Sequence, residues 1–231
     1  MSSAARALLI GLIDHAPLFP PASLSLEGAL EDHRRALASP HAWMVSRFVS
    51  PASRLGELDG APLRLSLVAD VEPHALDDRV EAIEGKDPAL ARLGRETYLE
   101  DVDLEQVKAV GARAKVRCGP EPPPVDELAA FIRRCRAEGI PFKATAGLHH
   151  AVRAEGQHGF LNVLAAAVFA DEEVALAEDD PEAFRLGAAF RWRDREASAA
   201  EVSEVRHSLF VSIGSCSFTE PVEELEALAF L

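Results

Sequence analysis

Hydrophobic residues in this sequence gather in short runs that alternate with segments of helical periodicity. The short runs are bounded by glycine, proline or charged residues, which is typical of buried strands. They cover residues 7–13, 43–49, 63–69, 96–100, 114–118, 141–147 and 209–214. Each run is too short for a helix of ordinary length, so the pattern predicts a sheet built from brief strands.

The segments between these runs carry apolar residues at helical spacing. They cover residues 26–38, 77–83, 104–110, 126–138, 158–170, 198–207 and 221–229. Ser25 is an expected N-cap for the first helix, and Gly139 an expected stop for the fourth. Outside the predicted helix over 198–207, the stretch 171–208 is harder to assign. Its sequence AFRLGAAFRWRD is consistent with a hairpin around Gly187.

Repeated alternation of strands and helices predicts a parallel sheet with crossover helices. The number of units suits a single (β/α)8 barrel domain over residues 1–231, with an irregular unit after the sixth predicted strand. An open doubly wound sheet is the alternative. We prefer the barrel, because no GxGxxG sequence follows the first strand and no Walker sequence is present.

Composition narrows the class of partner. The chain has 231 residues, is 48% hydrophobic and carries a formal net charge of -14, which argues against a nucleic-acid partner. A small anionic molecule held in a local basic pocket is compatible with this charge. The opening apolar run is too short for a membrane span, so we expect a cytoplasmic protein without a membrane partner. The sequence leaves homo-oligomer formation open.

Lysine usage points to a functional site. Only four of the 24 basic residues are lysines, and two of these, Lys115 and Lys143, lie within apolar strand-like runs. Side chains alternate between the two faces of a strand, so Lys143 and Thr145 share one face of their strand, and Lys115 and Arg117 share one face of theirs. A buried lysine is costly unless it is paired or has a chemical role. Lysine, unlike arginine, is able to lose its proton and act as a nucleophile.

In a barrel, the chemistry belongs at the carboxyl ends of the strands. We expect the two lysines to lie close together, so that neighbouring cations depress the pKa of a Schiff-base amine, with a carboxylate as general acid and base. The predicted catalytic residues are Lys143, Lys115, Glu100 and Asp14. The predicted substrate- or anion-binding residues are Arg47, Arg117, Thr145, Gly214, Ser215 and Ser217, the last three in a turn before the final helix.

Short motifs in the carboxyl half carry a resemblance to a known family. The sequence F-K-x-T-x-G over 142–147, the earlier K-V-x-x-G and the late glycine-serine turn resemble class I aldolases of the deoxyribose-phosphate aldolase type. The resemblance implies a barrel in which Lys143 forms the Schiff base and the turn at Gly214 holds a phosphate. This sequence lacks the second family lysine on the following strand. The chain also resembles a family of bacterial proteins with FKATAGLHH, HGFLN and GSCSF motifs, which implies no activity.

Two alternatives to a lyase remain open at this level. His149, His150 and His158 supply enough nitrogen ligands for a divalent metal, although we favour no cofactor. A non-catalytic barrel, in which Lys143 and Lys115 belong to a buried ion network, is the other alternative. Lysines that face an open cavity favour the enzyme, whereas fully paired lysines favour the scaffold.

Overall fold

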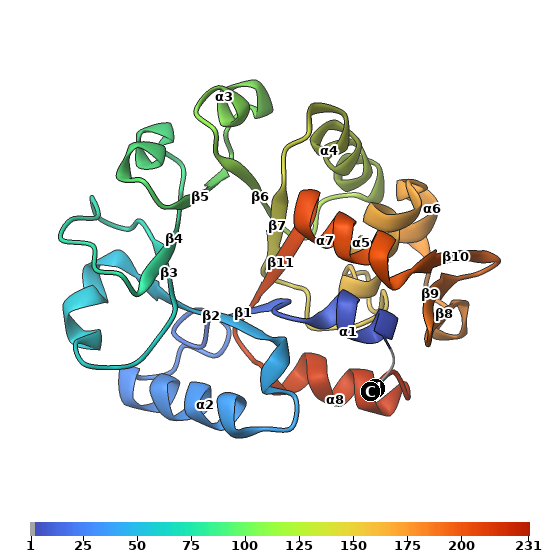
Figure 1. Ribbon diagram of the computed structural model, residues 1–231, viewed down its shortest axis with the longest axis horizontal. Helices are drawn as coiled ribbons and strands as arrows, with labels where there is room; N and C mark the ends of the chain where they lie inside the picture. The colour runs from blue at the N-terminus through green and yellow to red at the C-terminus, as the bar shows by residue number, and fades with distance from the viewer. Residues whose placement is uncertain (1–2) are drawn as a thin grey trace.

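The computed structural model describes residues 3–231, and its centre is a closed barrel of eight parallel strands (Figure 1). These are β1 (Ile13–His15), β2 (Val45–Pro51), β3 (Leu65–Val68), β4 (Val80–Gly85), β5 (Glu96–Glu100), β6 (Arg113–Arg117), β7 (Phe142–Thr145) and β11 (Phe210–Ser215). They follow their sequence order around the ring, and β1 closes it between β2 and β11. The predicted (β/α)8 barrel is confirmed.

Helices cover the outside of the barrel (Figure 1). The α-helices that follow β1 are α2 (Leu26–Ala38), α3 (Leu104–Ala109), α4 (Val125–Glu138), α5 (Phe160–Phe169), α6 (Glu172–Ala177), α7 (Ala199–Ser208) and α8 (Thr219–Ala227). Short 3-10 helices are η1 (Ala42–Met44), η2 (Ala52–Leu58), η3 (Pro88–Leu93) and η4 (Pro181–Ala183). As predicted, Ser25 caps α2 by accepting a hydrogen bond from the Gly28 amide at 3.2 Å. Gly139, with a φ of 67°, ends α4 in the left-handed conformation.

The predicted first strand over 7–13 is wrong. Helix α1 (Ser3–Leu9) occupies its first three residues, Gly11, at a φ of 53°, turns the chain, and β1 begins only at Ile13. Leu8 and Leu9 are buried in the helix, as they would be in a strand, so hydrophobicity alone does not separate the two structures. Helix α1 packs against α7, and the buried guanidinium of Arg206 on α7 donates to the carbonyl of Leu8. These long-range contacts decide the conformation.

The predicted helix over 77–83 is also wrong, because strand β4 occupies most of that region. Val80, Ala82 and Glu84 alternate with Glu81 and Ile83, and this period of two is the pattern of a strand. The polar residues before Val80 conceal the alternation. The strand that completes the barrel therefore lies before the fifth strand, and not in the irregular stretch after β7.

The irregular unit predicted after the sixth strand is confirmed, although that strand is the seventh of the barrel. Between α6 and α7 the chain forms a separate antiparallel sheet of β8 (Phe184–Leu186), β9 (Ala189–Trp192) and β10 (Arg195–Ser198). β8 and β9 form the expected hairpin around Gly187. Figure 1 shows this sheet at the edge of the molecule, outside the ring.

The apolar core divides into two clusters of unequal size. The larger cluster lies between the barrel and helices α1 and α4–α8, and it includes Phe142, Phe160 and Phe210. The smaller one, around Phe48 and Leu67, lies beside β2–β4, where 3-10 helices and loops replace most of the outer helices. The barrel is therefore anchored most firmly along β7 and β11, the strands that carry Lys143 and Ser212.

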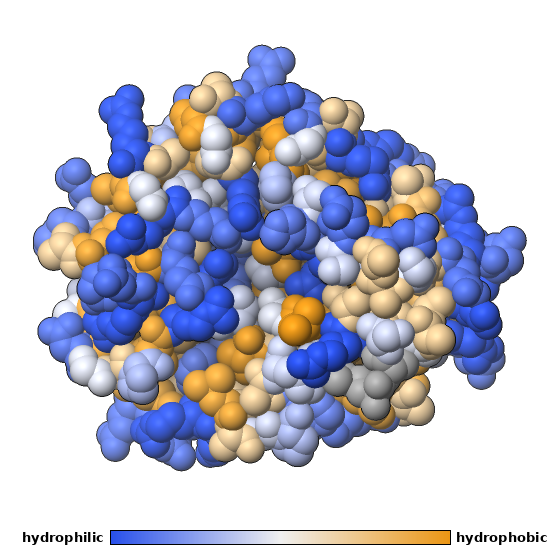
Figure 2. Space-filling model, viewed as in Figure 1, coloured by the Kyte–Doolittle hydropathy of each residue, from blue (hydrophilic) through white to orange (hydrophobic). Residues whose placement is uncertain are grey.

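The surface is mainly hydrophilic. Figure 2 shows apolar side chains as small groups between hydrophilic ones on the face drawn there. The most exposed large apolar residues, Ile10 and Leu37, belong to different elements. Within residues 3–231, no helix combines the length and the hydrophobicity that crossing a membrane requires.

Candidate active site

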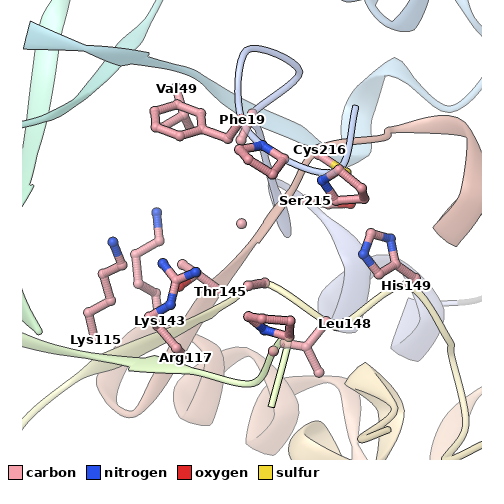
Figure 3. Close-up of a pocket in the computed structure, with 18 of the residues that line it drawn as sticks. Phe19, Val49, Lys115, Arg117, Lys143, Thr145, Leu148, His149, Ser215 and Cys216 are labelled. Carbon is pink, nitrogen blue, oxygen red and sulfur yellow. The ribbon is translucent and has the colours of Figure 1, made fainter. Parts of the chain in front are cut away.

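A cavity of about 520 Å³ opens at the carboxyl ends of the barrel strands. Its lining comes from strand ends and from the loops that follow β1, β6 and β7. Figure 3 shows Lys115, Lys143 and Arg117 on one side of this cavity, with Phe19 and Val49 across from them. The carboxyl end is where the fold predicts chemistry.

Lys143 lies on the floor of the cavity, and no part of its side chain is exposed to solvent. Its Nζ lies 2.5 Å from Asp14 Oδ2 and 2.8 Å from Glu84 Oε1. Ser212 also donates to Asp14 Oδ2 at 2.9 Å, and Ser66 donates to Glu84 Oε1 at 2.7 Å. The ammonium group is therefore held between two carboxylates that hydroxyl groups orient.

Lys115 extends this arrangement toward the cavity mouth. Its Nζ lies 3.0 Å from Glu84 Oε2 and 3.0 Å from Glu100 Oε2. The sheet register places Lys115 beside both Glu100 and Lys143 on the neighbouring strands. Glu84 therefore bridges the two lysines, and a continuous chain of charged contacts runs from Asp14 to Glu100.

The contacts determine the charge of Lys143. Burial disfavours its charge, but Asp14 and Glu84 outweigh that effect and raise the pKa of Lys143 above its usual value. Burial opposes ionisation of Glu84 too, yet Lys143 and Lys115 lower its pKa. The expectation of a depressed lysine pKa is wrong, because carboxylates and not cations contact Nζ. In the resting protein, Lys143 and Glu84 form an ion pair.

Glu84 is the member of this site that sequence reasoning missed. It falls just after the segment 77–83, which was interpreted as a helix, so its side chain had no assigned direction. The alternation of Val80, Ala82 and Glu84 was the available signal. Lys143, Lys115, Glu100 and Asp14, the four predicted catalytic residues, are brought together as expected, and their roles remain predictions.

Arg117 and Thr145 line the cavity as expected from strand alternation. Arg117 lies at the end of β6 and is exposed, and no carboxylate within residues 3–231 forms an ion pair with it. Thr145 is the register partner of both Arg117 and Gly214. The arginine is thus a cation at the cavity that remains free to bind an anion.

Arg47 does not belong to the cavity, so its predicted role in binding substrate there is wrong. Its guanidinium contacts Glu81 at 3.0 Å and Glu96 at 3.1 Å, two residues near the amino ends of β4 and β5. The sequence placed Arg47 in the second predicted strand but could not tell at which end of the barrel its ion partners lie.

The turn Gly214–Ser217 is engaged in its own hydrogen bonds. Ser215 Oγ donates to the Ser217 carbonyl at 2.6 Å, and Ser217 Oγ accepts from the Glu220 amide at 3.2 Å. A Cβ on Gly214 would lie 2.9 Å from Thr145 Cγ2, so packing against Thr145 accounts for that glycine. Of the predicted binding residues in this turn, Gly214 and Ser215 line the cavity together with Cys216, whereas Ser217 serves the start of α8.

The three histidines of the metal alternative do not converge. His149 contacts Glu220 at 2.8 Å, His150 contacts Glu224 at 2.9 Å, and His158 contacts the carbonyl of Pro123 at 2.8 Å. Throughout residues 3–231, no group of three or more His, Cys, Asp or Glu side chains is placed to hold a metal ion. The proposed histidine cluster is therefore wrong, and His149 and His150 instead attach the loop after β7 to α8.

The HGFLN motif has a structural explanation. Asn162 is fully buried, its Oδ1 accepts from the Arg153 amide at 2.8 Å, and its Nδ2 donates to the carbonyls of Ala175 and Glu178. A Cβ on Gly159 would collide with Asn162 Oδ1 and nearby backbone. These residues fix the loop that carries His149 and Gln157 along the cavity.

Fold and site together define an eight-stranded parallel α/β barrel with a buried lysine–carboxylate network beneath a cavity. Comparisons of the chain with protein-family models, curated proteins and solved structures find no match. The resemblance to class I aldolases therefore rests on the short motifs alone.

Proposed function

We propose that this protein is a lyase that binds a small anionic carbonyl compound in the barrel cavity and forms a Schiff base with it through Lys143. The observation that carries the proposal is the position of Lys143 at the cavity floor, between Asp14 and Glu84 and beside a second paired lysine, Lys115, on the neighbouring strand. Perturbed, buried ionisable groups beneath a cavity are typical of catalytic sites.

The paired state of Lys143 requires an activation step. The ammonium must first give a proton to a carboxylate, and Asp14 suits this role, because its Oδ1 is buried without a hydrogen-bond partner among the described residues. Binding of a ligand excludes water from the floor, which favours the neutral pair over separated charges. Proton transfer within the existing 2.5 Å contact then yields a neutral amine.

The neutral amine attacks the carbonyl carbon of the substrate, forming a C–N bond while the carbonyl oxygen takes up a proton. Loss of that oxygen as water leaves the imine. Glu84 lies between both lysines and serves to relay protons between Lys143 and Lys115, and Glu100 completes the relay. A carboxylate of the relay then takes the proton of a hydroxyl on the carbon β to the imine, the bond between the α and β carbons breaks, the β carbon leaves as an aldehyde, and the protonated imine accepts the electron pair to become an enamine.

Borohydride reduction tests this proposal directly. The protein is incubated with small aldehydes and keto acids, reduced, and analysed by intact mass and peptide mapping. We expect one adduct on Lys143 that is lost in Lys143→Arg and retained in the exposed control Lys108→Arg. The absence of an adduct across the panel, or adduct formation that Lys143→Arg leaves unchanged, would contradict the proposal.

The complete pairing of Lys143 favours a second candidate function, a barrel that binds a small anion without chemistry. Buried ion networks shift pKa values without taking part in catalysis. This candidate gains support if ligands bind the cavity with measurable affinity while no ligand of the panel is ever trapped on Lys143.

A further inference from the structure

The cavity walls bear on the kind of molecule that the site accepts. Above the charged floor, the lining is mainly apolar and includes Phe19, Pro20, Pro21, Val49, Val68 and Leu148. Sugars carry a hydroxyl on nearly every carbon, and each hydroxyl that enters an apolar pocket without a partner costs free energy. A ligand with an apolar carbon chain matches these walls better.

The charges around the cavity limit the charge of the ligand. Two lysines and three carboxylates form the floor network, so its ordinary ionised state leaves one carboxylate charge in excess. Arg117 is the cavity cation that no carboxylate of residues 3–231 pairs with. A guanidinium binds a carboxylate through two parallel hydrogen bonds. One guanidinium neutralises a monoanion, whereas a phosphate dianion beside the carboxylate-rich floor keeps an uncompensated charge.

The glycine-serine turn supports the same conclusion. Its hydroxyl groups at Ser215 and Ser217 are already engaged in local hydrogen bonds, and Ser217 lies away from the cavity lining. The following helix α8 has Glu220 in its first turn, which repels an anion. A phosphate site at this turn would have to replace these contacts.

We infer that the substrate is a monocarboxylate with an apolar carbon chain and a carbonyl group, such as a 2-oxo acid whose branched or aromatic chain carries the one hydroxyl, two carbons from the carbonyl, that cleavage requires, and not a phosphorylated sugar. Arg117 binds the carboxylate, the apolar wall accepts the chain, and the carbonyl is directed toward the floor. The carbonyl part of this inference rests on the proposed Schiff-base function, whereas the charge and the apolar chain follow from the cavity itself.

Ligand binding and borohydride trapping on Lys143 are measured separately, so that a failure of the ligand class can be told apart from a failure of the Schiff-base function. Calorimetry uses 4-methylpentanoate, which has the carboxylate and the chain but no carbonyl, and glyceraldehyde 3-phosphate as the competing class. We expect 4-methylpentanoate to bind wild type and to lose roughly tenfold or more in affinity in Arg117→Gln, as expected when a charge-assisted hydrogen-bonded pair is removed. Arg185→Gln, which alters an exposed arginine on β8, is the matched control and should bind like wild type.

Borohydride trapping then uses 4-methyl-2-oxopentanoate, pyruvate and glyceraldehyde 3-phosphate. Preferential trapping of 4-methyl-2-oxopentanoate supports both proposals. Binding of 4-methylpentanoate without any trapped adduct upholds the ligand class and overturns the Schiff-base function. Preferential trapping of glyceraldehyde 3-phosphate, or unchanged affinity in Arg117→Gln, overturns the ligand class.

A variant of the cavity wall tests the apolar subsite. Val49→Thr adds a hydroxyl to the wall at nearly constant shape, so it should weaken the binding of 4-methylpentanoate more than the binding of acetate. An equal effect on both ligands contradicts the apolar subsite.

Discussion

The two ends of the barrel interior hold ion networks of similar composition but with different cations. The amino end is built from Arg47, Arg64, Arg113, Glu81, Glu96 and the hydroxyl of Tyr98. The carboxyl end is built from Lys143, Lys115, Asp14, Glu84 and Glu100. The ring of Tyr98 connects them, because Lys143 Nζ lies 5.1 Å from its centroid while its hydroxyl contacts the arginine network.

The difference teaches where protons are able to move. A guanidinium keeps its charge at any usable pH and forms permanent, forked contacts, which suits the closed end of the barrel. An ammonium group transfers its proton to a neighbouring carboxylate far more readily. The ion network at the amino end of the barrel uses arginine, whereas the network beneath the cavity uses lysine, so the rare lysines of this sequence mark the floor of the site.

The largest expected effect comes from Lys143→Met. Removing the ammonium leaves Asp14 and Glu84 buried close together without their shared cation, which typically costs about 3–5 kcal/mol of unfolding free energy. Urea denaturation at pH 7 measures the loss, and the loss should shrink as the pH falls and the carboxylates become protonated. Adding Asp14→Asn to Lys143→Met should recover part of the stability. A single variant as stable as wild type would contradict the ion-pair description of the floor.

A buried histidine pair, with His15 on β1 and His33 on α2, is uncharged at neutral pH and can be compared with the charged floor of the cavity. His15 Nδ1 lies 3.1 Å from His33 Nδ1, and burial lowers the pKa of each histidine from 6.5 to about 4. Between these values the unfolded chain binds more protons than the folded one, so stability falls as the pH drops from 6.5 toward 4. We expect a loss of roughly 3 kcal/mol for each histidine across this window. The Glu84 contribution is lost as the pH falls further, below the carboxylate range.

Urea denaturation at pH 7 and pH 4.5 measures this window. His33→Phe should reduce the difference in unfolding free energy between the two pH values. His74→Gln, at an exposed position, should leave the difference unchanged. Equal pH dependence in wild type and His33→Phe would show that the histidine pair is not the titrating element.

At the amino end, Arg47→Met should cost less than Lys143→Met. Glu81 keeps Arg64 at 2.7 Å, and Glu96 keeps Arg113 at 2.9 Å, so both carboxylates retain a partner. A loss of about 1–3 kcal/mol is expected from the broken charged hydrogen bonds. Adduct formation on Lys143 should remain unchanged, as measured by borohydride trapping. A loss of trapping in folded Arg47→Met would contradict the separation of the two networks.

The smallest effect is expected for Lys86→Met. Lys86 Nζ contacts Asp101 at 2.6 Å, a distance like those on the floor, but both side chains are about two thirds exposed. Water and salt screen such a pair, so the urea midpoint should not move measurably. A shift comparable to that of Lys143→Met would show that burial is not what distinguishes the floor lysines.

Much of the fold and part of the site followed from local patterns. Strand alternation correctly placed Lys143, Lys115 and Thr145 inside the barrel. It could not identify Glu84 as the shared partner of the two lysines. The contact between Lys143 and Glu84 joins residues 59 apart in sequence and depends on the sheet register. The roles expected for Arg47 and for His149 failed for the same reason. Side-chain direction is a local property, whereas the choice of ion partner is settled by distant strands.

The closure of the barrel by β1 has a consequence for the order in which the chain is made. A ribosome delivers this three-residue strand before the other barrel strands, yet β1 pairs with β11, which emerges after all of them. Arg206 likewise donates hydrogen bonds to the carbonyls of Leu8 and Phe210, so these contacts also form only after β11 has begun to emerge. Asp14 therefore meets Ser212 only after the nearly 200 residues between them have been synthesised. We expect nascent chains that end before Phe210 to lack the assembled floor, so the contacts of Lys143 with Asp14 and of Asp14 with Ser212 form together only after β11 has emerged.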